Sequence, residues 1–116
     1  MSKYIYLLHF QTPIHHAQHY TGITTDLAER MVRHFNGSGS KLTAEFARLK
    51  IAFTIARVWE GAAQEDERRM KEMKNGRQYC PVCNKTKARK LFGELRPIPK
   101  SALKQSGLQL TYKHEG

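Results

Sequence analysis

The pattern of hydrophobic and polar positions predicts that the chain begins with two strands. Residues 3–10 are rich in aromatic and branched side chains, which indicates a strand buried on much of both faces. Residues 11–17 contain Pro13 and two histidines and are typical of a loop. Residues 18–23 predict a second, short strand that ends near Gly22. The short separation of the two strands favours an antiparallel hairpin.

Helical periodicity follows this hairpin. Three apolar side chains recur every four residues and predict one buried stripe: Leu27, Met31 and Phe35. Thr24 or Thr25 is expected to cap this helix, and Gly37 to end it. Thr43 is expected to cap a short helix that runs through about Leu49.

Apolar and polar side chains alternate along residues 51–59, which predicts a third strand. Its apolar side chains are expected on one side, with Arg57 as the exception: Ile51, Phe53, Ile55 and Trp59. Residues 62–75 are strong helix formers, and Gly76 is a natural stop. The order of elements predicts a small α/β (α+β) domain, with a three-stranded antiparallel or mixed sheet packed against helices.

The remaining residues differ in character, so we divide the chain into a compact domain, residues 1–76, and a basic extension, residues 77–116. The extension contains a CxxC motif and a short helix expected at residues 86–92. Beyond Pro97 only a few side chains can be buried: Leu103, Leu108, Leu110 and Tyr112. The sequence therefore predicts a poorly ordered tail.

Charge narrows the function. The 116 residues have a formal net charge of +10, which points to a polyanionic partner. The basic residues are spread over the whole chain rather than along one amphipathic helix, which favours nucleic acid over a membrane. No apolar stretch approaches 18 residues, and the N-terminus lacks a signal-peptide pattern. We therefore expect a cytoplasmic protein.

The CxxC motif, Cys80-Pro81-Val82-Cys83, leaves three interpretations open. Two reduced thiols on a basic extension, half of a zinc site and a redox pair all fit the spacing. A zinc site would need two histidines from elsewhere in the chain or a second copy of the chain. The histidines at positions 15, 16 and 19 leave metal binding open as an alternative, but a histidine cluster in a loop is more often solvent-exposed or substrate-facing, and we favour that interpretation.

Five side chains have the chemistry that phosphodiester cleavage needs: Tyr6, Tyr20, Arg30, His34 and Glu67. Arg30 and His34 are four residues apart and share one helix face. A carboxylate can hold Mg²⁺ or Mn²⁺, an arginine can clamp a phosphate, and a tyrosine or histidine can take a proton from water.

Several short motifs in order resemble the GIY-YIG nuclease domain. They are Tyr4-Ile5-Tyr6, Tyr20-Thr21-Gly22, the helix segment Asp26–Arg30, His34, Asn36-Gly37, the Gly39–Thr43 stretch and a later helix glutamate. The run from Tyr20 to Leu27 is most similar to the small stand-alone bacterial members. The resemblance covers residues 3 to about 75. The sequence departs from the family pattern at Tyr4, where the family has glycine, and at Thr21, where it has Ile or Val.

The resemblance implies one active site and hydrolysis of DNA with one divalent metal. Tyr6, Tyr20 and Arg30 match family positions, and His34 matches a position where the family carries His or Tyr. Glu67 matches the glutamate that binds Mg²⁺ or Mn²⁺. Zinc at Cys80 and Cys83 is a further possibility. Six basic residues are assigned to DNA contacts: Lys41, Lys71, Lys85, Lys87, Arg89 and Lys90.

The alternative is a nucleic-acid binder that uses the same fold without catalysis. It would share the charge and the sheet, and only cleavage would separate it from an enzyme. The sequence leaves the DNA substrate, the general base and the choice between monomer and dimer open.

Overall fold

The computed structural model describes residues 3–62, 79–83 and 96–114. Three strands form the centre of the sheet: β1 (Lys3–Ile14), β2 (Ala17–Thr24) and β3 (Phe53–Ala62). Strand β1 lies between β2 and β3 and pairs antiparallel with both. Helices α1 (Leu27–Asn36) and α2 (Lys41–Arg48) connect β2 to β3. The predicted α+β class and hairpin are confirmed. The helices predicted at 62–75 and 86–92 lie outside the described residues.

The C-terminal segment belongs to the same sheet, which has five strands among the described residues rather than the predicted three. Strands β4 (Arg96–Pro97) and β5 (Thr111–Tyr112) both pair antiparallel with β3. Between them, α4 (Lys100–Gln105) buries Leu103 against the core. The expectation of a poorly ordered tail beyond Pro97 is wrong for residues 98–114, because their few apolar side chains pack against the sheet and α1. Tyr112, for example, stacks on Phe53 with ring centres 4.9 Å apart.

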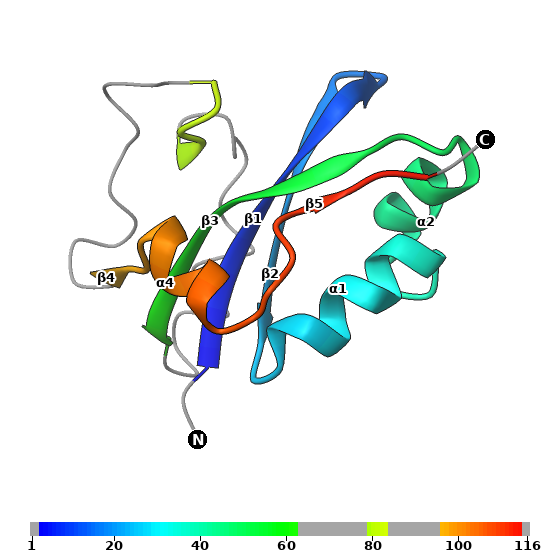
Figure 1. Ribbon diagram of the computed structural model, residues 1–116. Coiled ribbons are helices and arrows are strands. Elements are labelled where there is room, and N and C mark those ends of the chain that lie inside the picture. The colour runs from blue at the N-terminus through cyan, green and yellow to red at the C-terminus, as the bar shows by residue number, and fades with distance from the viewer. Residues whose placement is uncertain (1–2, 63–78, 84–95, 115–116) are drawn as a thin grey trace.

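The two faces of the sheet have separate cores. Even-numbered side chains of β1 lie on the face of the sheet that the helices cover. They pack there with Met31 of α1 and Phe46 of α2. Odd-numbered β1 side chains, with Trp59 of β3, pack with Cys80 on the opposite face. Figure 1 shows α1 and α2 on one side of the sheet and the segment around residues 79–83 on the other.

A β-bulge in β3 corrects one prediction. Leu7 pairs with Arg57 whereas Leu8 pairs with Ile55, so one extra residue, Ala56, is inserted in β3. The insertion reverses the alternation, because a shift of one residue exchanges the two faces. Trp59 therefore lies on the face opposite Ile55, not beside it as predicted.

The helix starts differ from the predicted caps. The Asp26 side chain caps α1 by accepting from the Glu29 backbone N–H, while the Thr24 hydroxyl accepts from Asp26 N. Ser40 caps α2, and Thr43 completes a capping box three residues later. Gly37 ends α1 at a φ of 83°, as predicted.

Strand β1 also extends further than predicted, through Pro13 to a turn at His15 and His16. Beyond Phe10, the last β1 residue paired with β3, the hairpin is a two-stranded ribbon. Pro13 lacks a backbone N–H, which an edge position of this kind tolerates.

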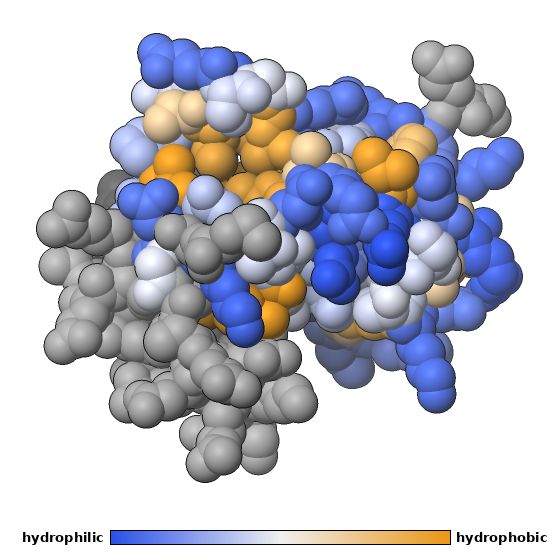
Figure 2. Space-filling view, turned by 90° about the horizontal axis from the view of Figure 1, so that it is seen from below, coloured by the Kyte–Doolittle hydropathy of each residue, from blue (hydrophilic) through white to orange (hydrophobic). Residues whose placement is uncertain are grey.

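Hydrophilic side chains cover much of the described surface seen from below, and hydrophobic side chains show in recesses between them (Figure 2). Within the described ranges, no helix is both long and apolar enough to cross a membrane.

The burial of Leu103 predicts that α4 contributes to folding stability. Leu103→Ala should lower the free energy of unfolding by about 2–5 kcal/mol, because it leaves a cavity beside the sheet. Lys104→Ala, at the exposed neighbouring position of the same helix, should change it by less than about 0.5 kcal/mol. Urea unfolding measures both. Equal effects of the two variants would show that α4 does not pack on the core.

Candidate active site

A buried hydrogen bond joins the first strand to the first long helix. The Tyr6 hydroxyl of β1 donates to His34 Nε2 of α1 over 2.6 Å. Both side chains are almost fully buried. Their burial follows from parity and periodicity: Tyr6 is on the helix-facing side of β1, and His34 lies about one turn after Met31 on the buried stripe of α1.

Thr43 fixes the orientation of His34. His34 Nδ1 lies 3.0 Å from Thr43 Oγ1, which also receives the backbone N–H of Ser40. The Thr43 hydroxyl donates to the Ser40 carbonyl oxygen at 3.2 Å. His34 Nδ1 is then the donor to Thr43, which leaves Nε2 as the acceptor for Tyr6. The sequence analysis assigned Thr43 only to a helix cap and missed its contact with His34. A capping-box residue close to a buried histidine is the signal that could have indicated this contact.

Two glycines make room for this pair. Gly22 of β2 is the register partner of Tyr6, and a Cβ on Gly22 would overlap the Tyr6 phenol. A Cβ on Gly39 would overlap the His34 ring in the same way. The group that takes the space left by the missing Gly22 side chain is thus the Tyr6 phenol.

Tyr20 and Arg30 complete the described part of the cluster. The Tyr20 ring is half-buried, with its centre 6.3 Å from that of Tyr6 and 5.0 Å from that of His34. Arg30 lies one turn before His34 on α1, as predicted. Its Nε is buried and has no hydrogen-bond partner among the described residues. A guanidinium with an open donor in a polar cluster is suited to an anionic ligand.

Burial and the charge of Arg30 set the protonation of the pair. Burial, followed by the Arg30 charge, lowers the pKa of His34 from 6.5 to about 4, so the imidazole is neutral at pH 7. Burial, followed by Tyr20, raises the pKa of Tyr6 well above its usual range, and Arg30 opposes this rise. The resting state is therefore a neutral phenol that donates to a neutral imidazole.

Of Glu67 and the six predicted DNA-contact residues, only Lys41 is among the described residues. Lys41 is exposed in the first turn of α2. The others lie outside the described residues: Glu67, Lys71, Lys85, Lys87, Arg89 and Lys90.

A second group of polar side chains gathers on the opposite face of the sheet. His9 and His19 are register partners in β1 and β2, and both reach Cys80 and Cys83. The four ligand atoms lie within 4.8 Å of one another. The sequence interpretation of His19 as solvent-exposed or substrate-facing is wrong, and His9 was missed. The sequence predicted the hairpin but not its register. The register that places Tyr6 opposite Gly22 also places His9 opposite His19, and without it the histidine pair could not be found.

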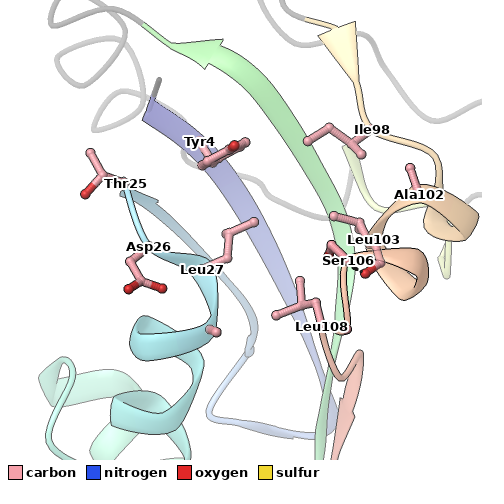
Figure 3. Close-up of a pocket in the computed structure, with 11 residues that line it drawn as sticks. Tyr4, Thr25, Asp26, Leu27, Ile98, Ala102, Leu103, Ser106 and Leu108 are labelled. Atoms are coloured by element: carbon pink, nitrogen blue, oxygen red, sulfur yellow. Dashed lines mark hydrogen bonds between the residues drawn. The ribbon is translucent and has the colours of Figure 1, made fainter. Parts of the chain in front are cut away.

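A separate pocket of about 370 Å³ lies between the start of α1 and the C-terminal segment. Figure 3 shows Leu27 on one side of it and Ile98 and Leu103 on the other, with Tyr4 between them. Its lining includes none of the four clustered residues, Tyr6, Tyr20, Arg30 and His34. The hydrogen-bonded cluster, rather than this apolar pocket, has the groups that acid–base chemistry requires.

The comparison with known families agrees with this arrangement. The family model for the GIY-YIG catalytic domain matches residues 2–80, which is more than half of the chain. The chain therefore belongs to the GIY-YIG family, whose members are nucleases that act on DNA and generally use divalent metals. The searches of curated proteins and of solved structures found no match.

The contact between Gly22 and Tyr6 predicts a steric penalty. Gly22→Ala should lower the free energy of unfolding by about 1–3 kcal/mol, because the buried phenol has no room to move. Thermal or urea unfolding measures the loss. The same substitution should cost less in a Tyr6→Leu background, where the shorter side chain leaves space for the methyl group. An equal cost in both backgrounds would contradict the proposed overlap.

The lowered pKa of His34 predicts a pH dependence of stability. Between pH 6.5 and about 4 the unfolded chain binds a proton at this position that the folded protein does not. The free energy of unfolding should therefore fall as pH decreases through this window, and His34 should contribute no pH dependence above it.

The difference in urea unfolding between wild type and His34→Gln, measured from pH 7 to pH 4, isolates this contribution. His15→Asn, at an exposed turn position with φ 52°, is the matched control and should retain the wild-type dependence. A His34→Gln curve parallel to wild type would contradict the prediction.

Proposed function

We propose that this protein is a metal-dependent endonuclease that hydrolyses DNA phosphodiester bonds. The observation that carries the proposal is the buried Tyr6–His34 hydrogen bond beside an arginine whose Nε is buried without a described partner. A proton donor–acceptor pair and an open guanidinium donor are two groups that attack on a phosphodiester requires. Membership of a nuclease family supports the same reaction.

Tyr6 is the group that we assign to activate water. Its phenol is held protonated by burial, so it acts through a relay rather than as a resting phenolate. As water attacks phosphorus, its proton passes to Tyr6 Oη, and the hydroxyl proton of Tyr6 passes to His34 Nε2. The P–O bond to the leaving oxygen breaks in the same reaction. Tyr20, half-buried beside both rings, is assigned to the solvent side of this relay.

Arg30 is assigned to the phosphate. Its guanidinium can donate two hydrogen bonds to non-bridging oxygens, and its charge offsets the charge that develops there. The described side chains of the cluster suit an anion rather than a cation, so the metal needs a carboxylate from another segment. Glu67 is the residue that we expect to hold Mg²⁺ or Mn²⁺, which when bound would stabilise charge on the phosphate and the leaving oxygen.

The positive charge of the chain supplies DNA affinity. A net charge of +10 favours contacts to the phosphate backbone, and Lys41 extends from the exposed start of α2. We assign the same role to Lys71 and to the basic run in the extension, residues 85–90. We thus assign the chemistry to residues 1–76. In the extension, residues 77–116, we assign contacts with the DNA phosphate backbone to the basic run. We propose that the protein acts in the cytoplasm.

A cleavage panel tests this function. Duplex, flap, branched and single-stranded DNA are incubated with the purified protein and Mg²⁺ or Mn²⁺. Tyr6→Phe removes the relay while retaining the ring, and Glu67→Ala removes the metal carboxylate. Each should slow cleavage by about 100-fold or more without weakening DNA binding to the same extent. Arg30→Ala should slow it as well.

Arg33→Ala is the matched control for Arg30→Ala. Arg33 is exposed on the same helix and forms an ion pair with Glu29, so its loss should leave the cleavage rate within about twofold of wild type. Salt-dependent binding to every substrate with no turnover would favour the non-catalytic binder instead. If Glu67→Ala cleaved DNA at the wild-type rate, Glu67 would not be the residue that holds the metal.

A further inference from the structure

The polar group opposite the active-site cluster has the composition of a metal centre. Two imidazole nitrogens and two cysteine sulfurs come together from the neighbouring strands β1 and β2 and from the turn at residues 80–83, which is distant in the sequence. Neither cysteine is in a disulfide. Cysteine and histidine in a 2:2 set are typical ligands of zinc.

The distances match a tetrahedral ion. His9 Nδ1 lies 3.1 Å from His19 Nε2, 3.5 Å from Cys80 Sγ and 3.6 Å from Cys83 Sγ. Cys83 Sγ lies 3.5 Å from His19 Nε2. Around a zinc ion with ordinary bond lengths, two nitrogens are about 3.3 Å apart, and a nitrogen and a sulfur about 3.5 Å. Four of the six distances between ligand atoms therefore match those around one tetrahedral ion, and all six are within 4.8 Å.

Hydrogen bonds alone do not explain this convergence. A neutral imidazole nitrogen has either one N–H or one lone pair, so His9 Nδ1 can form a single good hydrogen bond. It nevertheless approaches three potential partners. One cation at the centre would satisfy all four ligand atoms together.

The CxxC turn and the hairpin each bring two ligands together. In the turn, the backbone N–H groups of Val82 and Cys83 are hydrogen-bonded to Cys80, and the Cys80 and Cys83 sulfurs lie within 4.8 Å of each other. On the strand side, the direct opposition of His9 and His19 in the hairpin places both rings on one face.

We propose that the protein holds one structural Zn²⁺ ion on this face of the sheet, with four ligands from a single chain: His9, His19, Cys80 and Cys83. Four protein ligands close the coordination sphere, so the ion would not bind substrate. On binding, Zn²⁺ replaces the two thiol protons, which pass to solvent. The ion fastens the turn at residues 80–83 to the β1–β2 hairpin, on the face away from Tyr6. The second copy of the chain considered from the sequence is not needed.

Other uses of the four residues make different predictions. A two-iron cluster attaches its cysteine and histidine pairs to separate irons, which is incompatible with four ligand atoms within 4.8 Å. A redox pair would form a disulfide between Cys80 and Cys83 and would not involve the histidines.

Elemental analysis of the untagged full chain, purified without chelator, is the first test. We expect about one zinc per monomer and no stoichiometric iron. Replacement by Co²⁺ should give the visible absorption of a tetrahedral centre with thiolate ligands. This readout uses the wild-type protein and is independent of whether variants fold. Removal of zinc by EDTA should lower the melting temperature, and added Zn²⁺ should restore it.

Variants of two of the three half-buried ligands give the second test. Cys83→Ser and His19→Gln should each weaken zinc binding by more than about 100-fold, because each removes a direct ligand. Their melting temperatures should no longer respond to EDTA. His15→Asn, in the exposed turn of the same hairpin, is the matched control and should retain one zinc per chain.

Four results would overturn the proposal. The first is a wild-type protein that has two titratable thiols but takes up no added Zn²⁺, and the second is a disulfide between Cys80 and Cys83. The third is zinc that is found only in a dimer, and the fourth is full zinc content in His19→Gln. Loss of DNA cleavage is not part of the test, so failure of the zinc proposal and failure of the proposed nuclease activity are distinguishable.

Discussion

The pairing of strand β1 with both β2 and β3 determines what each face of the protein can do. Because β1 is central, the pleat sends Tyr6 toward the helices and His9 toward the other face, and neighbours on both sides hold that orientation. A slip of one residue would exchange the two sets. The Tyr6–His34 hydrogen bond and the histidine–cysteine group therefore both depend on one register.

The helix-facing cluster shows how a small domain keeps polar groups in its core. Tyr6 and His34 satisfy each other, and Thr43 satisfies the remaining imidazole nitrogen, so burial leaves neither group unpaired. The bonds require close approach, which Gly22 and Gly39 permit by lacking a Cβ. Arg30 is the exception, since its Nε lacks a described partner. A buried guanidinium nitrogen without a described partner, next to a neutral phenol and imidazole, is the arrangement expected where an anion binds.

On the opposite face, the buried group among the described residues consists of Ile5, Leu7, Ala56 and Trp59, together with Cys80. A metal centre that links the hairpin to the CxxC turn would add folding free energy on this face. The C-terminal segment serves a similar purpose on the helix side, where Leu103 and Tyr112 close the core beside β3.

Local patterns indicated the central elements and the family. Aromatic and branched residues indicated β1, period-four spacing indicated α1 and period-two spacing indicated β3. The order of short motifs around Tyr6, Tyr20 and Arg30 indicated a GIY-YIG domain. The sequence could not place His9 beside Cys80, the bulge at Ala56 or the packing of residues 98–114, because each depends on contacts between distant segments rather than on neighbours along the chain. Residue types and local periodicity determined which chemistry is present; strand register and packing decided which of those side chains meet.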